Sequence, residues 1–352
     1  MAKSKTISLQ KFLGVELPII QAPMAGVQDS ALVVAVSNAG GLGSLPCAML
    51  SLDAMRTELT IIRTQTDKPF NVNFFCHTPP EPNAEREAAW RAALLPYYQE
   101  YGIDPNDIPT GPGRKPFDSE TAEALEAFKP AVVSFHFGLP PADLLARVKA
   151  WGSKILASAT TVDEARWLEA RGVDGIIAQG LEAGGHRGMF LSEDLTTQAG
   201  TFALVPQIVR EVKLPVIAAG GIADAKGVAA ALALGATAVQ IGTAYLLCPE
   251  ATTSAIHRAA LRSEAARHTA LTNLFSGRPA RGIINRIMRE LGPISTVTPA
   301  FPLATAAINP LRAQAENRGS ADFSPLWCGQ NANGCKEAPA AVLTRELAVD
   351  LK

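Results

Sequence analysis

The chain has 352 residues, long enough to bury a large core, and its formal net charge is -1. Hydrophobic residues make up 47% of it and charged residues 18%, a balance that excludes a disordered protein and indicates a globular one. The near-zero charge argues against nucleic acid or an anionic membrane surface as the main partner.

Short apolar segments of strand length recur along the first 250 residues, and most are followed by a helical pattern. Helices are predicted at 30–38, at 161–171 after a Thr161–Glu164 capping box, and at 225–234 after Asp224. Parallel neighbouring strands need crossover connections, so this alternation predicts an α/β protein with a parallel sheet. The eight predicted strands are 18–22, 41–45, 70–75, 131–137, 154–159, 175–179, 215–219 and 238–244.

Eight such units fit a closed (β/α)8 TIM barrel better than a doubly wound sheet, because no Gly-x-Gly-x-x-Gly follows the first strand. Residues 76–121 are proline-rich around a helical pattern at 84–101 and are expected to form an insertion after the third strand. Beyond Cys248 the strand pattern fades into helices. We therefore predict a barrel at 1–250, a smaller helical domain at 251–320 covering its mouth, and a C-terminal segment at 321–352 packing back on the barrel.

Neither the cysteines nor the N-terminal segment indicates a metal centre or export. The five cysteines form no Cys-x-x-Cys pair and have no metal-ligand spacing, so no metal is expected. The first residues lack the apolar core of a signal peptide, and no uncharged apolar stretch is long enough to span a membrane. We expect a cytoplasmic protein without membrane contact, either a monomer or a homodimer.

Glycines at the ends of the last two predicted strands indicate a phosphate site. Gly220 and Gly221 follow the seventh strand, and Ile241, Gly242 and Thr243 lie at the end of the eighth. TIM barrels frequently bind phosphate at these loops, where free backbone N–H groups and helix dipoles stabilise an anion. Paired glycines are also common in tight turns, but their occurrence at both strands favours phosphate.

Three amide side chains, Asn73, Gln179 and Gln240, lie inside otherwise apolar strands. Burying an unpaired amide costs about 1–3 kcal/mol, so each needs a partner. For any one of these amides, a hydrogen bond within the barrel core is as good an explanation as a bound ligand. Three near one mouth favour a heteroaromatic ring with several donors and acceptors, such as a flavin.

A glycine-rich loop after the sixth strand contains His186, and the glycines would let another molecule approach the backbone. Histidine titrates near neutral pH, so His186 is our candidate catalytic residue. His136 in the fourth strand is its competitor and a candidate substrate-binding residue. We expect His77 to be structural, and His257 and His268 to lie on the surface.

Six motifs between residue 18 and about residue 282 occur together: Gln21-Ala-Pro-Met-Ala-Gly26, Asn71-Val-Asn-Phe-Phe75, Ala178-Gln-Gly-Leu-Glu-Ala-Gly-Gly-His-Arg-Gly188, Ala218-Ala-Gly-Gly-Ile222, Gln240-Ile-Gly-Thr-Ala-Tyr245 and Phe275-Ser-Gly-Arg-Pro-Ala-Arg-Gly282. In this combination the chain resembles the class I nitronate monooxygenases, formerly called 2-nitropropane dioxygenases. The Glu-Ala-Gly-Gly-His-Arg-Gly string is the most specific part of the resemblance.

The resemblance implies non-covalent FMN, no metal, and a TIM barrel with a helical second domain. It implies oxidation of alkyl nitronates, with propionate 3-nitronate as the physiological substrate, by dioxygen through a flavin semiquinone to the carbonyl compound and nitrite or nitrate. By position, Pro23 and Met24 border the ring, Asn73 and Gln179 hydrogen-bond the flavin, and His186 is catalytic. The other implied cofactor-binding residues are Gly184, Gly185, Gly220, Gly221, Gln240, Ile241, Gly242 and Thr243.

Two questions stay open on the sequence. His186 would donate a hydrogen bond to an anionic nitronate, or would act as the base that removes the α-proton of a neutral nitroalkane. Other activities on the same barrel are those of an FMN-dependent enoyl-ACP reductase and an NAD(P)H:quinone reductase. A phosphate-sugar isomerase or a non-catalytic flavin-binding protein could use the same phosphate site.

Overall fold

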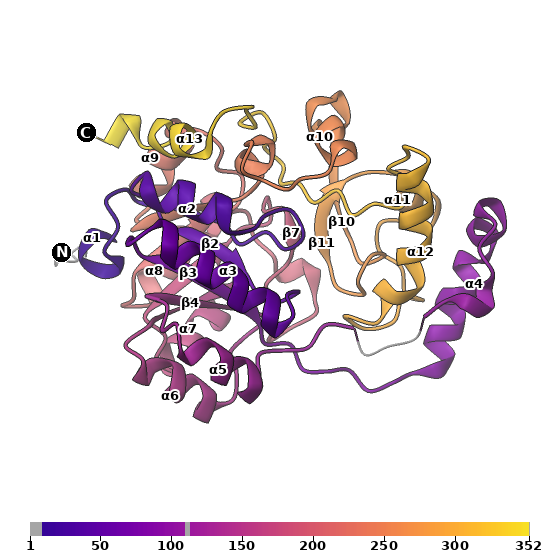
Figure 1. Ribbon diagram of the computed structural model, residues 1–352, viewed down its shortest axis with the longest axis horizontal. Helices are drawn as coiled ribbons and strands as arrows, with labels where there is room; N and C mark the ends of the chain where they lie inside the picture. Colours follow the sequence, from indigo (N-terminus) through magenta and orange to yellow (C-terminus); the bar gives the residue numbers. More distant parts are fainter. Residues whose placement is uncertain (1–8, 110–112, 352) are drawn as a thin grey trace.

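Eight parallel strands form a nearly closed barrel in the computed structural model, which describes residues 9–109 and 113–351 (Figure 1). Their order is β1-β9-β8-β6-β5-β4-β3-β2, and the ring closes where Ile20 bridges Leu42 in parallel. All eight predicted strands and the TIM barrel are confirmed. The strands are β1 (Ile19–Gln21), β2 (Gly43–Pro46), β3 (Phe70–Phe75), β4 (Val132–His136), β5 (Lys154–Ala159), β6 (Gly175–Gln179), β8 (Val216–Ala219) and β9 (Ala238–Ile241).

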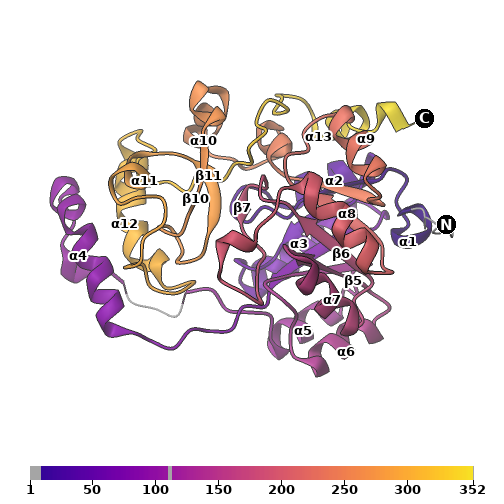
Figure 2. The ribbon, with the colours of Figure 1, turned by 180° about the vertical axis from the view of Figure 1, so that it is seen from behind.

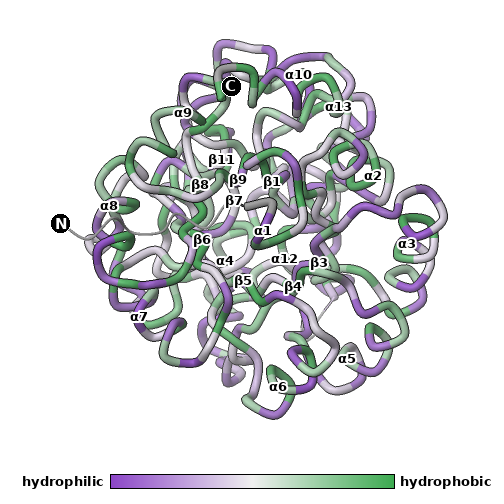
Figure 3. Tube along the Cα trace, turned by 90° about the vertical axis from the view of Figure 1, so that its left-hand side faces the viewer, coloured by the Kyte–Doolittle hydropathy of each residue, from purple (hydrophilic) through white to green (hydrophobic). Residues whose placement is uncertain are grey.

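Helices surround the strands, as the view along the barrel shows (Figure 3). The predicted helices are confirmed as α2 (Ser30–Asn38), α7 (Val162–Ala170) and α9 (Ala225–Ala233). The side chains of Thr161 and Asp224 cap the N-termini of α7 and α9. The short helix α1 (Leu9–Leu13) lies at the N-terminal end of the barrel, where Leu13 packs against interior residues such as Ile177. The surrounding helices are α2 (Ser30–Asn38), α3 (Leu52–Gln65), α5 (Ser119–Glu126), α6 (Ala142–Ala150), α7 (Val162–Ala170), α8 (Thr201–Glu211) and α9 (Ala225–Ala233).

Side chains alternate between the two faces of each barrel strand, as the period of a strand requires. In β6, Ile176 packs in the layer between strands and helices, whereas Ile177 packs inside the barrel. Val239 and Ile241 of β9 likewise face the helices, which leaves Gln240 between them on the inner face. The alternation therefore selects which residue at each strand end can reach the barrel mouth.

A second lobe lies beyond the C-terminal ends of the strands and contains a sheet as well as helices (Figures 1 and 2). The expectation of helices alone after Cys248 is wrong, because β10 (Thr269–Thr272) and β11 (Ala280–Ile283) pair antiparallel. These strands have only four residues each and include Arg281 and Gly282, so their pattern is too short to be read. The lobe's helices are α10 (Ala255–Arg262), α11 (Arg286–Glu290) and α12 (Ala304–Asn317).

The predicted helix at 84–101 is confirmed as α4 (Ala84–Tyr101), and it packs on the second lobe rather than on the barrel. The Trp90 Nε1–H donates to the Ala304 carbonyl at 3.2 Å, and the Tyr98 hydroxyl donates to the Ala307 carbonyl at 2.7 Å. Helix α4 thus lies on the far side of α12 from the barrel (Figures 1 and 2).

The C-terminal helix α13 (Ala340–Glu346) packs on the barrel helix α2, and the Thr344 hydroxyl lies 2.9 Å from the Tyr245 hydroxyl. No helix within residues 9–109 and 113–351 is both long and apolar enough to cross a membrane. Short 3-10 helices complete the elements: η1 (Pro105–Asp107), η2 (Leu195–Thr197), η3 (Thr243–Leu247), η4 (Glu264–Arg267) and η5 (Val349–Leu351).

Candidate active site

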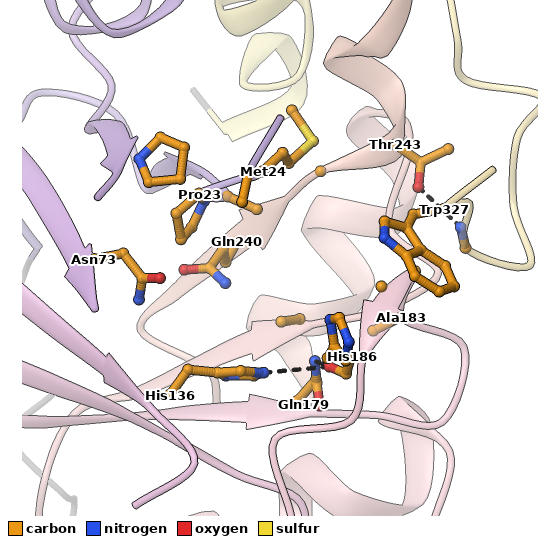
Figure 4. A pocket seen from close by; sticks show the side chains of 18 of the residues that line it. Pro23, Met24, Asn73, His136, Gln179, Ala183, His186, Gln240, Thr243 and Trp327 are labelled. Atoms are coloured by element: carbon orange, nitrogen blue, oxygen red, sulfur yellow. Dashed lines mark hydrogen bonds between the residues drawn. The ribbon is translucent and has the colours of Figure 1, made fainter. Parts of the chain in front are cut away.

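A cavity of about 190 Å³ opens at the C-terminal ends of the barrel strands (Figure 4). Ile241 does not line it; the side chain points outward into the core, because it alternates with Gln240 along β9. Every other predicted site residue lines the cavity: Pro23, Met24, Asn73, His136, Gln179, Gly184, Gly185, His186, Gly220, Gly221, Gln240, Gly242 and Thr243.

His186 lies on β7 (Gly185–His186), which pairs antiparallel with β11 of the second lobe. Its Nε2 atom lies 2.8 Å from the Ser276 Oγ, and Nδ1 has no hydrogen-bond partner in the described part of the chain. The imidazole packs against the rings of Phe301 and Trp327, each with its centroid 5.4 Å away. One ring nitrogen of a cavity-lining histidine is therefore available to a ligand.

The pKa of His186 is held well below its usual range, so the imidazole is neutral at neutral pH. Burial of the ring is the largest cause, because it disfavours the charged form. The positive charges of Arg114 and Arg278 and the proximity of His136 act in the same direction. A neutral ring can act as a hydrogen-bond acceptor or as a base.

His136 holds the backbone of the loop that contains His186. Its Nε2 lies 3.2 Å from the His186 carbonyl oxygen, and Nδ1 lies 2.9 Å from the Ser158 Oγ. Because a carbonyl only accepts, Nε2 carries the proton and Nδ1 accepts from the serine hydroxyl. Burial lowers the pKa of His136 to about 3, which keeps this neutral tautomer. Both nitrogens are thus engaged, so His136 acts as a positioning residue in this structure.

Gln179 also binds this loop, as Figure 4 shows. Its side-chain N–H donates to the His186 carbonyl at 2.9 Å, and its side-chain oxygen accepts the Gly188 N–H at 2.7 Å. The fully buried Arg187 stabilises the end of β6, because its guanidinium donates to the carbonyls of Gln179 and Gly180 at 2.7 and 2.6 Å. The backbone around His186 is therefore held in part by residues close to it in sequence.

Two predicted amides present unpaired oxygens. Asn73 donates through Nδ2 to the carbonyl and hydroxyl oxygens of Ser134, and its Oδ1 has no partner among the described residues. The Gln240 Oε1 is buried without a hydrogen-bond partner in the same part of the chain. An unsatisfied buried acceptor such as the Gln240 Oε1 is costly, and with the free Asn73 Oδ1 it fits a bound molecule that offers N–H or O–H donors.

The glycine loops after β8 and β9 are tied together by a segment of the C-terminal region. The Gly329 N–H donates to the Thr243 Oγ1 at 2.9 Å, and the Asn331 side chain donates to the Gly221 carbonyl at 3.0 Å. The backbone N–H groups of Gly221 and Gly242 donate to no residue that the structure describes. Free backbone donors in such loops are suited to an anion such as a phosphate.

The sequence suggested that Gly184 lets a ligand approach the backbone, but in the structure another segment of the chain packs against it. A Cβ at this position would lie 2.6 Å from the Gly329 nitrogen and 2.7 Å from the Cys328 carbonyl carbon. The C-terminal segment thus occupies the space next to Gly184. At Gly185 no atom lies within 4 Å of such a Cβ, but φ is +71°, in the left-handed region that favours glycine.

Sequence reasoning missed several residues of the cavity. Of the histidines, His268 is exposed as expected, but the surface prediction for His257 is wrong: it is 5% exposed, lines the cavity and donates from Nε2 to the Trp327 carbonyl. Its amphipathic helix gave no sign of which face is covered. Ser276, which contacts His186 without lining the cavity, could have been found, because it lies within the motif at 275–282. The other missed residues that bear on the chemistry are Arg114, Trp327, Gly329 and Asn331.

Comparison with known proteins gives a consistent result. The model of the family described as "Nitronate monooxygenase" matches residues 6–350. A "Nitronate monooxygenase" of Paraburkholderia phytofirmans is 46% identical over 351 residues, covering 98% of this chain and 95% of that protein. One of Pseudomonas aeruginosa is 44% identical over 350 residues, covering 97% and 98%.

Two solved structures are similar as well. A nitroalkane oxidase from Streptomyces ansochromogenes aligns with a TM-score of 0.88 at 38% identity, covering 97% of each chain. FabK from Thermotoga maritima aligns with a TM-score of 0.71 at 27% identity, covering 97% of this chain and 94% of that one. The higher sequence identity and the higher TM-score lie with proteins named for nitronate and nitroalkane chemistry. The chain is an oxidoreductase and belongs to the nitronate monooxygenase family.

Proposed function

We propose that this protein uses FMN and dioxygen to oxidise alkyl nitronates, with propionate 3-nitronate as its substrate and the carbonyl compound with nitrite or nitrate as products. Family membership supports the oxidation of a nitronate. The structural observation that carries the proposal is the neutral His186, which has an unpaired nitrogen in a cavity suited to a flavin nucleotide.

The residues present fit FMN at both of its polar ends. The unpaired oxygens of Asn73 and Gln240 would accept from the N–H edge of the ring system. The free backbone N–H groups of Gly221 and Gly242, with the Thr243 hydroxyl, would hold the phosphate. When bound there, FMN would supply one-electron chemistry with the substrate and dioxygen.

The chain's own residues bind and orient the substrate. A nitronate already carries the negative charge of a carbanion equivalent, so no proton has to be removed from it. Phe75 and Trp327 line the cavity beside His186, and Phe137 and Phe301 pack on the same imidazole, so this apolar surrounding would exclude water from the reacting carbon. Exclusion of water strengthens the hydrogen bond from the imidazole to the nitro group.

Ser276 lets one neutral imidazole serve both roles considered for His186. Its hydroxyl can accept from Nε2–H, which leaves the Nδ1 lone pair as a base toward a neutral nitroalkane. The same hydroxyl can instead donate to Nε2, which leaves Nδ1–H to donate to an anionic nitronate. The two roles then differ in tautomer and not in net charge.

The test is oxygen consumption and nitrite release on propionate 3-nitronate by protein reconstituted with FMN. We expect turnover by the wild type, a loss of about 10²–10⁴-fold on a neutral nitroalkane in His186→Asn, and no loss in the surface control His268→Asn. A protein that stays colourless after reconstitution would contradict the proposal.

The reductase alternative is tested with the same preparation. NADH and NADPH are mixed anaerobically with the reconstituted protein, and the flavin absorbance is recorded. A reductase would bleach its flavin rapidly, whereas we expect the spectrum to remain oxidised until a nitronate is added. Rapid bleaching by either nucleotide, without turnover of nitronate, would favour the reductase.

A further inference from the structure

The cavity contains one charged side chain in the part of the chain that the structure describes. Arg114 lines it, no lining residue there is an aspartate, glutamate or lysine, and its histidines have lowered pKa values. The local field is therefore positive, and nothing in the described lining neutralises it. Such a site attracts anions.

The guanidinium of Arg114 lies over the Phe301 ring, with Cζ 5.6 Å from the ring centre, but has no hydrogen-bonding or ionic partner among the described residues. The residue is nevertheless half-buried. Burial lowers the pKa of Arg114, because the charged form has lost part of its hydration. A partly desolvated cation without a partner is unfavourable, and a bound anion would offset that cost.

The neighbouring Arg278 differs in this respect. Its guanidinium donates to the Met189 carbonyl and lies 4.2 Å from the centre of the Phe137 ring, and it does not line the cavity. Arg278 is thus held in place by the protein. Arg114 is held at its backbone, where the His77 Nε2–H donates to its carbonyl at 3.1 Å, and its guanidinium lies over the Phe301 ring without a hydrogen-bond acceptor among the described residues. This contact also explains the structural role expected for His77.

Arg114 and His186 both pack against the ring of Phe301. The Arg114 Cζ lies 5.6 Å from the centre of the Phe301 ring, and the His186 ring lies 5.4 Å from the same centre. Phe301 belongs to an apolar cluster with Phe75 and Phe137. A ligand that reaches both the imidazole and the guanidinium therefore needs two polar ends joined by a short apolar link.

We propose that Arg114 binds a carboxylate at the far end of the substrate and so selects carboxylated nitronates over alkyl nitronates of the same length. The inference rests on the proposed function, since it assigns the reacting nitronate group to the His186 side. Arginine suits this task because its planar fork of donors matches a carboxylate with two parallel hydrogen bonds. Arg114 is then a specificity-determining residue.

The test compares propionate 3-nitronate with propyl-1-nitronate, which has the same carbon number and no carboxylate. In Arg114→Met we expect kcat/KM on propionate 3-nitronate to fall about 10- to 100-fold, the range for a lost hydrogen bond to a charged group. The loss should lie mainly in KM, because the carboxylate is remote from the reacting carbon. On propyl-1-nitronate the change should stay within about threefold.

Two further variants complete the design. Arg114→Lys keeps a point charge and should recover part of the loss on the carboxylated substrate. The exposed Arg210→Met on α8 removes a charge away from the cavity lining and should leave both substrates unaffected. Equal losses on the two nitronates in Arg114→Met, or no loss on either, would overturn the inference.

A binding measurement separates this inference from the proposed function. Anaerobic calorimetric titration with 3-nitropropionate reports the carboxylate contact without turnover, because the oxidant is absent, and Arg114→Met should weaken this binding about 10- to 100-fold. A protein that binds 3-nitropropionate through Arg114 and oxidises neither nitronate would contradict the proposed function alone. Unchanged 3-nitropropionate binding in Arg114→Met, with normal turnover by the wild type, would contradict the role of Arg114 alone.

Discussion

The Nε2 atom of His186 lies 2.8 Å from the hydroxyl oxygen of Ser276, and the two residues come from different parts of the fold. His186 follows barrel strand β6, whereas Ser276 lies between β10 and β11 in the second lobe. The orientation and the tautomer of the ring therefore depend on how the second lobe is seated over the barrel.

Replacement of Ser276 tests this dependence. In Ser276→Ala the imidazole loses its one hydrogen bond among the described residues, so we expect kcat/KM on a neutral nitroalkane to fall about 10-fold, the effect of one hydrogen bond. Ser276→Thr keeps the hydroxyl and should retain more activity than the alanine variant. Steady-state kinetics on nitroethane would measure both, and full activity in Ser276→Ala would show that the contact does not orient the ring.

The charge of Arg114 should shift the pH dependence of kcat/KM in a predictable direction. A positive charge near His186 disfavours the imidazolium form and lowers its pKa, so removing that charge raises the pKa. We expect the acid limb of kcat/KM for nitroethane to move to higher pH in Arg114→Met and to stay in place in Arg114→Lys. A limb that moves to lower pH, or not at all, would contradict the electrostatic coupling.

Stability should fall as the pH drops below about 6.5. Burial lowers the pKa of His136 to about 3 and that of His257 to about 4. At a pH below about 6.5, the usual pKa of histidine, the unfolded state therefore binds more protons than the folded state. Each group then destabilises the fold by about 1.4 kcal/mol per pH unit, from about 6.5 down to its folded pKa. Urea unfolding at pH 7.5 and 5.5 measures the difference.

The matched variant for that experiment is His257→Gln, whose amide can still donate to the Trp327 carbonyl. It should show a shallower loss of stability between the two pH values. An equally steep loss would mean that His257 does not stay neutral in the folded protein.

Two adjacent glycines should respond differently to alanine. Gly184→Ala forces the backbone at Cys328 and Gly329 to move, so we expect a lower melting temperature, a cost of about 1–3 kcal/mol and weaker FMN binding. Gly185→Ala has room for its Cβ and should cost about 1–2 kcal/mol from the left-handed backbone, with a smaller effect on FMN. Thermal unfolding and FMN titration would measure both; equal effects on FMN binding would contradict the packing argument.

Local patterns were sufficient for the barrel. Each strand is an apolar run bounded by turn residues, and Asn73, Gln179 and Gln240 could be placed at one mouth because parallel strands end at the same edge. The side chain of Ile241 points away from the cavity, because successive side chains in a strand face opposite sides, whereas the prediction took a run of neighbours in sequence together.

The contribution of the second lobe could not be read from the sequence. Trp327 and Gly329 reach the cavity, and Ser276 reaches His186, only because segments distant in the chain pack over the barrel mouth, and this packing leaves no periodic pattern. Arg114 lies in a proline- and glycine-rich connection, where an arginine usually is a solvated surface residue. Its position beside Phe301 is a property of the tertiary fold.

The hydrogen bonds from Gly329 and Asn331 to the two glycine loops have a consequence for biosynthesis. All eight barrel strands emerge from the ribosome well before these residues do. A nascent chain therefore contains every barrel strand before it contains the residues that tie the proposed FMN site together, and we expect stable FMN uptake only at the end of translation. A truncated product that ends before Gly329 would not retain the flavin, so incomplete copies of this oxidoreductase would be released without a redox centre.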